Sequence, residues 1–130
     1  MKYLGVDFGT KRLGIAISDA DASFAFPRES ILFDAKAFET LEQIVNEEKI
    51  VAIVMGDTRT LNGGANDITV RAEDFAKRME ELLNVPVHRV REAWSSQEAD
   101  RYAPQGRKHN DSSAAAIILQ RFLDANPKSE

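Results

Sequence analysis

The order of hydrophobic and polar positions predicts strands at the beginning of the chain and alternating strands and helices after them. Two short apolar stretches, Lys2 to Asp7 and Leu13 to Ser18, are separated by the residues FGTKR, which is typical of two strands joined by a hairpin. A third strand is expected near Phe24 to Phe33. The stretch Asp34 to Lys49 then changes to a helical period with one apolar face, which predicts an amphipathic helix.

The middle of the chain continues with a buried strand, a helix and another strand. Ile50 to Met55 is apolar without alternation, as expected of a central strand that is covered on both faces and ends at Gly56. Helical spacing returns from Asp67 to Leu83, and a strand is expected after Pro86, through about Arg91.

Two helices are expected at the end of the chain. Ser95-Ser96-Gln97-Glu98 has the spacing of a capping box, which predicts a short helix to about Tyr102. A last helix is expected from about Asp111 to Leu123. Hairpins in the first half and helical crossovers in the second imply an α/β fold with a five-stranded mixed sheet flanked by helices.

Composition favours one domain over residues 1–130, with residues 126–130 as a frayed tail. The chain has 130 residues and no cysteine, which excludes disulfides, thiolate nucleophiles and Cys-ligated metal centres. The longest apolar run is too short for a membrane span, and the N-terminus turns acidic before any signal-peptide core develops. The cytoplasm is therefore the expected location, with no membrane partner.

The net charge argues mildly against a polybasic nucleic-acid binder, because 17 basic residues stand against 21 acidic ones. The distribution of charge along the chain points the other way. Residues 1–33 and 86–121 are neutral or basic although both contain acidic candidates, as expected of a site that joins carboxylates to a polyanion.

Three acidic residues fall at the ends of expected elements: Asp7, Glu92 and Asp111. Carboxylates that converge on one edge of a sheet form the ligand set that Mg²⁺ or Mn²⁺ prefers. Each residue also has a structural interpretation, because Asp7 could cap a turn, Glu92 could be a solvated strand end and Asp111 could be an N-terminal helix acid. Only their combination favours a metal site.

The glycine-containing connection between the first two strands invites a phosphate-binding interpretation. Lys11 and Arg12 lie between Gly9 and Gly14, and glycines allow backbone amides to approach an anion. The segment is not a Walker A loop, because Ile15 follows the second glycine where that motif needs Lys. Lys11 and Arg12 could contact phosphates or could be ordinary turn charges.

The sequence resembles the YqgF/RuvX family, which comprises pre-16S rRNA nucleases and Holliday junction resolvase-like proteins of the RNase H-like superfamily. The first segment, GVDFGTKRLGIAISD, contains Asp7 and matches the family's first motif closely. VMG at Val54 to Gly56 resembles the second block, VREAWSS from Val90 resembles the third, and HNDSSAAAIILQRFLD resembles the fourth. The similarity extends over nearly the whole chain.

This resemblance implies an RNase H-like fold and a metal-dependent nuclease that processes the 5′ end of pre-16S rRNA in ribosome biogenesis. The implied catalytic and metal-binding residues are Asp7, Glu92 and Asp111, with Mg²⁺ or Mn²⁺ as cofactor. Five residues are expected to contact nucleic acid: Thr10, Lys11, Arg12, Arg107 and Lys108. RNA is the favoured partner.

Two alternatives stay open, the first because neither spacing nor charge distinguishes RNA from a branched DNA junction, and the second because the sequence departs from the family pattern. Arg91 stands where the family usually has Asp, Ala93 where it usually has Arg, and Asp57 follows Gly56 in place of a Leu-Pro pair. One alternative is a Holliday junction resolvase that acts on branched DNA in recombination and repair. The other is a nucleic-acid-binding module with impaired catalysis. The protein is expected to be a monomer or a homodimer, and a resolvase needs the dimer.

Overall fold

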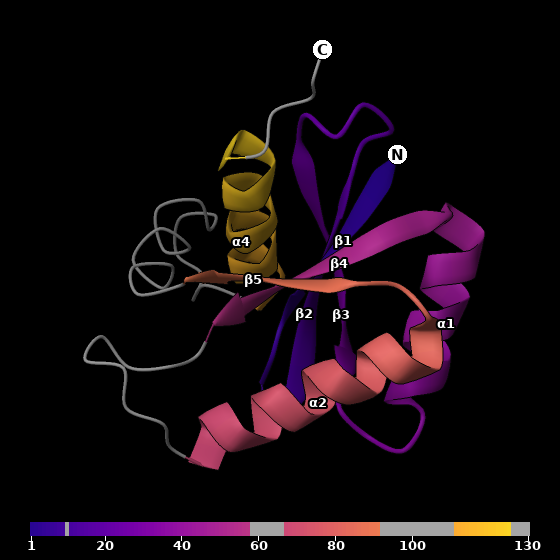
Figure 1. Cartoon of the computed structure of the whole chain (residues 1–130), viewed down its shortest axis with the longest axis vertical. Helices are drawn as coiled ribbons and strands as arrows, with labels where there is room; N and C mark the ends of the chain where they lie inside the picture. Colours follow the sequence, from indigo (N-terminus) through magenta and orange to yellow (C-terminus); the bar gives the residue numbers. More distant parts are fainter. Residues whose placement is uncertain (10, 58–66, 92–110, 126–130) are drawn as a thin grey trace.

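A computed structural model describes residues 1–9, 11–57, 67–91 and 111–125, with only the backbone described at 57, 67–69, 91 and 111–113. The strands are β1 (Lys2–Asp7), β2 (Arg12–Ser18), β3 (Ala25–Leu32), β4 (Ile50–Asp57) and β5 (Val87–Arg91), and the helices are α1 (Ala37–Glu48), α2 (Asp67–Leu83) and α4 (Asp111–Ala125). Figure 1 shows their arrangement. The expected short helix from Ser95 to Tyr102 lies outside the described residues.

The strands form one mixed sheet in the order β3-β2-β1-β4-β5. β1 pairs antiparallel with β2, and β2 pairs antiparallel with β3, which confirms the expected hairpins. β4 pairs in parallel with both β1 and β5. The helical crossovers α1 and α2 make this parallel pairing possible, because parallel neighbours cannot be joined by a tight turn.

Strand β4 departs from the sequence-based expectation at both ends. It continues past Met55 because Gly56 and Asp57 pair with Val90 and Arg91 of β5, so Gly56 does not end the strand. Near its beginning, Lys2 and Tyr3 of β1 pair with Ile50 and Ala52, which leaves Val51 as an extra residue. This bulge explains why Val51 is 40% exposed in a strand otherwise buried through Gly56.

Two hydrophobic cores lie on opposite faces of the sheet. Leu4, Val6 and Met55 pack with residues of α1 and α2 on one face. Val54 and Ala16 pack with α4 on the other face. Figure 1 shows α4 (yellow) set apart from α1 and α2. Helices of this length are only marginally stable in water by themselves. Each helix is therefore stabilised mainly by the apolar surface that it buries against the sheet.

Helix α1 is shorter than its pattern suggests because a turn precedes it. The expected boundary was Asp34, but the Asp34 Oδ1 accepts a hydrogen bond from the Lys36 N–H at 2.9 Å, and the helix begins at Ala37. Such an Asx turn is a common alternative to a helical first turn. The helix ends before Lys49, whose left-handed conformation (φ 57°) lets its N–H donate to the Val45 carbonyl.

None of the helices that the structure describes is both long enough and apolar enough to cross a lipid bilayer.

The carboxylate of Glu48 joins α1 to two strands and gives a testable pH dependence. The Lys2 Nζ donates to Glu48 Oε1 at 2.8 Å, and the Arg28 Nη2 lies 3.4 Å from Glu48 Oε2. The hydrogen bond from Lys2, reinforced by both positive charges, lowers the pKa of Glu48 below its ordinary value of 4.5. The ionised carboxylate therefore stabilises the fold above that value, and this contribution disappears as the pH falls through the lowered pKa.

We expect Glu48→Gln to lower the free energy of unfolding by about 0.5–1 kcal/mol at neutral pH. Urea denaturation of both proteins at pH 7 and at a series of acidic pH values measures the difference. The gap should narrow below pH 4.5. Glu42→Gln, on an exposed position of the same helix, is the control and should change little. A gap that widens in acid would contradict the stabilising role.

Candidate functional site

Asp7 is the last residue of β1 and belongs to the face of the sheet that carries α4. Successive strand residues point to opposite faces. Leu4 and Val6 are buried in the core beneath α1 and α2, whereas the ring of Tyr3 lies 5.5 Å from that of Phe122 in α4. The alternation thus places Asp7, like Tyr3, on the α4 face.

The connection after Asp7 is tight and requires glycine at one position. A Cβ atom at Gly9 would lie 2.4 Å from the carbonyl oxygen of Arg12, a backbone atom that cannot give way easily. The Phe33 N–H donates to the Lys11 carbonyl at 2.9 Å and ties the same turn to the end of β3. These contacts fix Lys11 and Arg12 close to the end of β1.

Lys11 and Arg12 are exposed, as a contact with phosphate requires. Exposure is equally expected if they are ordinary charged residues of a turn. The Arg12 Nε donates to the Ser30 Oγ at 3.2 Å across the β2–β3 pair. The other three residues expected to contact nucleic acid, Thr10, Arg107 and Lys108, lie outside the described residues. Phosphate binding by this set therefore stays a prediction.

Helix α4 crosses β1 at very short distance because Gly5 has no side chain. A Cβ atom at Gly5 would lie 2.9 Å from the Ala115 carbonyl oxygen and 2.9 Å from the Leu119 Cβ. Further along, Phe122 contacts Tyr3, near the beginning of β1. The helix therefore runs antiparallel to β1, so its N-terminus lies toward the end of the strand that carries Asp7.

This crossing brings Asp111 to the level of Asp7. Asp111 is the first residue of α4, one turn before Ala115, so it lies about 6 Å further along the helix axis. Asp7 lies two strand residues, about 7 Å, beyond Gly5 in the same direction. The backbone positions of two of the three expected residues therefore lie toward one end of the same face.

The third position, Glu92, follows the last residue of β5 and lies outside the described residues. The backbone register shows that β5 ends at the same edge as β1, because Val6 pairs with Met55 and Met55 pairs with Arg89. Within the described part of the chain, no three acidic or histidine side chains gather around a common point. The metal site therefore remains a prediction, although the carboxylate oxygens of this set have the donor chemistry that Mg²⁺ or Mn²⁺ takes.

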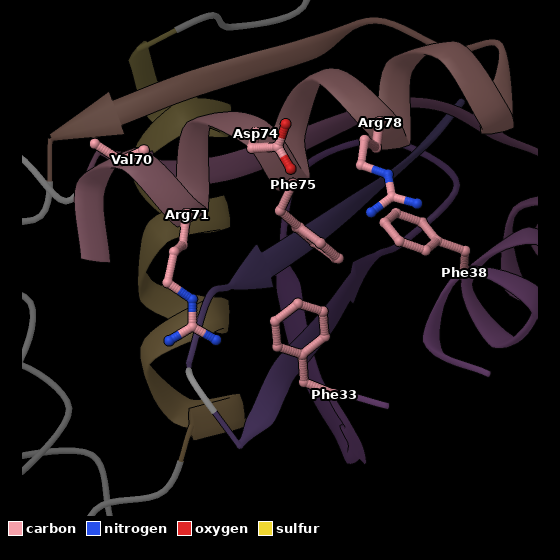
Figure 2. Close-up of a pocket in the computed structure, with 7 residues that line it drawn as sticks. All are labelled: Phe33, Phe38, Val70, Arg71, Asp74, Phe75 and Arg78. Atoms are coloured by element: carbon pink, nitrogen blue, oxygen red, sulfur yellow. The ribbon is translucent and has the colours of Figure 1, made fainter. Parts of the chain in front are cut away.

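A second feature near this edge was not anticipated from the sequence. Figure 2 shows a hollow between α1, α2 and the end of β3 that is lined by Phe33, Phe38, Val70, Arg71, Asp74, Phe75 and Arg78. The sequence pattern assigned its phenylalanines to a core. One signal for the hollow was present in the sequence. Arg71, Asp74 and Arg78 recur at helical spacing and therefore lie along one side of the helix, beside the apolar residue Phe75.

Comparison with known proteins decides the family. A family model described as "RuvX: Holliday junction resolvase" matches residues 1–125. The chain belongs to the RuvX family. Its relatives include proteins named "Putative pre-16S rRNA nuclease" from Maridesulfovibrio salexigens, 41% identical over 95% of this chain and 98% of the relative, and from Geobacillus thermodenitrificans, 35% identical over 96% and 99%. Relatives of this RuvX chain thus support a nuclease of the hydrolase class.

Solved structures confirm the RNase H-like fold expected for a RuvX protein. Thermus thermophilus RuvC in complex with a Holliday junction superposes with a TM-score of 0.63 over 97% of this chain and 95% of RuvC, at 13% identity. The fowlpox virus resolvase in complex with Holliday junction DNA gives a TM-score of 0.60 over 98% and 100%, also at 13% identity. At such low identity the likeness concerns the fold.

Proposed function

We propose that this RuvX chain is a metal-dependent nuclease that hydrolyses phosphodiester bonds and processes the 5′ end of pre-16S rRNA. The observation that supports the proposal is the close crossing of β1 and α4 at Gly5, which brings the backbone of residue 111 to the level of Asp7. The names of the relatives support the RNA substrate. Ribosome biogenesis would place the protein in the cytoplasm.

In this proposal Asp7, Glu92 and Asp111 hold one or two Mg²⁺ or Mn²⁺ ions. Three ionised carboxylates at one edge would repel one another. A cation bound between them would remove this repulsion, so the set favours metal binding. A bound ion would lower the pKa of a water molecule, which makes it a better nucleophile, and would stabilise negative charge on the attacking and leaving oxygens. Lys11 and Arg12 are proposed to bind the phosphates beside the scissile one, together with Thr10, Arg107 and Lys108.

Such phosphate contacts position the nucleic acid without reading its sequence. Affinity is then expected to fall steeply with salt, because each neutralised phosphate releases condensed counterions.

A Holliday junction resolvase is the second candidate. It is favoured by the family description and by the fold shared with RuvC and the fowlpox virus resolvase. Resolution cuts two strands symmetrically, so this function needs a homodimer, whereas cleavage of a single RNA strand can be done by a monomer.

Incubation with three substrates tests the proposal: a 5′-extended pre-16S rRNA fragment, an unrelated single-stranded RNA and a four-way DNA junction. Each is tested with Mg²⁺, Mn²⁺ or EDTA. We expect the rRNA precursor to be cut with either metal and to remain intact in EDTA. Symmetric cutting of the junction by a dimer would replace the first candidate with the second. Binding without any cutting would indicate a module with impaired catalysis and would overturn both.

A further inference from the structure

The hollow beside α2 combines flat aromatic walls with a charged rim. Its volume is about 330 Å³, at the small end of the range of ligand sites and therefore suited to a single small group. Phe75 is buried at its base, and Phe33 and Phe38 are partly exposed. Arg71, Asp74 and Arg78 are all exposed on α2, and Figure 2 shows both guanidinium groups on the side of the helix that faces the phenylalanines.

One wall of the hollow already stacks a planar cation. The guanidinium carbon of Arg78 lies 5.1 Å from the centre of the Phe38 ring, in a cation–π contact. Phe75 packs against the same ring, with 5.0 Å between ring centres and an interplanar angle of 34°. The flat surface left for a further group is therefore the outer side of the exposed Arg78 guanidinium, which Phe38 supports from behind. Arginine planes and aromatic rings are the two surfaces on which proteins stack unpaired nucleobases.

The hollow is joined to the turn that follows Asp7. Phe33 lines it, and the Phe33 N–H donates to the Lys11 carbonyl at 2.9 Å. The Phe33 ring also packs edge-on against Phe8, the residue after Asp7, with 5.3 Å between ring centres. A nucleic-acid strand that passes Lys11 at the sheet edge would therefore have to continue over this edge, along Phe33, to enter the hollow on the α1 and α2 face.

The order of charges along α2 suits a nucleotide better than a bare anion. Arg71 and Arg78 are two helical turns apart, about 10 Å, with Asp74 one turn from each. A carboxylate would repel a phosphate at the centre of this row. It can instead accept a hydrogen bond from the amino group of a base, as acidic side chains do with the N4 amino group of cytosine.

We propose that this hollow, which we call the α2 hollow, binds one unpaired nucleotide of the substrate strand at the edge of the sheet where Asp7 ends β1, on the face that carries α1 and α2. The base stacks on the outer side of the Arg78 guanidinium, which Phe38 holds in place. Asp74 accepts a hydrogen bond from the amino group of the base, and Arg71 contacts the adjacent phosphate. This inference rests on the proposed function because it takes the substrate to be a nucleic acid. It adds that the bound strand carries an unpaired base, preferably one with an amino group.

Binding of a single-stranded RNA oligonucleotide in EDTA tests the α2 hollow separately from cleavage. Fluorescence anisotropy is measured at several salt concentrations for the wild type and for the double variant Arg71→Gln/Arg78→Gln. The expected result is about a tenfold loss of affinity and a shallower salt dependence. The matched control is Lys36→Gln/Lys77→Gln, which removes two exposed positive charges from residues that do not line the hollow. The decrease in the logarithm of its affinity should be less than half the decrease in Arg71→Gln/Arg78→Gln.

A fluorescent base analogue tests stacking directly. An oligonucleotide with a single 2-aminopurine should lose fluorescence on binding to the wild type, and Phe38→Leu should prevent most of that loss while leaving far-UV circular dichroism unchanged. Base preference gives a further readout. A cytidine in an otherwise uridine-only strand should raise affinity several-fold, and Asp74→Asn should remove that gain.

The outcomes separate this inference from the nuclease proposal. Equal affinity losses in the two double variants, or unchanged quenching in Phe38→Leu, would overturn the α2 hollow as a nucleotide site even if the wild type cleaves RNA. A wild type that binds RNA through Arg71 and Arg78 but never cuts it would support the hollow and overturn the nuclease. Preference for an aromatic peptide over the RNA would assign the hollow to a protein partner and overturn the inference.

Discussion

Asp7→Asn is expected to reduce metal-dependent cleavage by roughly a thousandfold while the protein stays folded. The substitution keeps the shape of the side chain and removes one negative charge from the proposed metal-binding set. A carboxylate ligand that fixes a catalytic ion contributes several kcal/mol to stabilisation of the transition state, which corresponds to this loss. The measurement is the cleavage rate of the pre-16S rRNA fragment with Mg²⁺ or Mn²⁺, with circular dichroism as a check on folding.

The matched control is Asp124→Asn at the other end of α4. Asp124 Oδ1 accepts a hydrogen bond from the Gln120 Nε2 at 3.1 Å, and the amide oxygen of asparagine can keep that bond. Its cleavage rate should equal that of the wild type. Cleavage that survives Asp7→Asn would place the active site elsewhere or indicate a contaminating nuclease.

Gly5→Ala is expected to destabilise the protein by about 2 kcal/mol and to reduce cleavage more than the loss of folded protein explains. The added methyl group would lie 2.9 Å from both the Ala115 carbonyl oxygen and the Leu119 Cβ, closer than packed atoms approach. Forcing such an atom into a filled core costs about 1–3 kcal/mol. Because α4 carries Asp111, any shift of the helix away from β1 also moves a proposed metal ligand.

Urea denaturation measures the first effect, and the cleavage rate of the remaining folded protein measures the second. Leu119→Ala is a useful comparison, because it removes packing from the same crossing without forcing the helix away from β1. It should lower stability but retain more activity per folded molecule than Gly5→Ala. An unfolding free energy of Gly5→Ala within about 0.5 kcal/mol of the wild type would contradict the close crossing.

The order of elements and the mixed sheet were predictable from the sequence because each signal is local. Helix α2 was expected from Asp67 to Leu83 and has those bounds. The hairpin and the strands that alternate with helices were likewise expected and confirmed. The boundaries that differ, at Ala37 and after Met55, depend on an Asx turn and on pairing with β5. Pairing partners cannot be read from one segment alone.

The candidate site was predictable only in part. The resemblance to the family indicated Asp7 and Asp111, and the structure brings their backbone positions to one level, whereas Glu92 lies outside the described residues. The importance of Gly5 was not visible in the sequence, because it depends on which helix crosses that strand. The α2 hollow could not be predicted for a related reason. The sequence shows only that Phe33 and Phe38 are apolar, whereas tertiary packing decides how much of each ring remains exposed.

The crossing of α4 over β1 also determines when during synthesis the proposed site can form. Asp7 ends β1, the first strand, whereas Asp111 begins α4, which follows all five described strands in the sequence, and chains emerge from the ribosome N-terminus first. The α1 and α2 face can begin to pack before α4 exists, whereas the opposite face must wait for the last helix. A nascent chain would therefore hold no complete carboxylate set. If the chain is the proposed nuclease, its activity would appear only after α4 has emerged and docked, and this delay would protect RNA near the site of synthesis from unfinished enzyme.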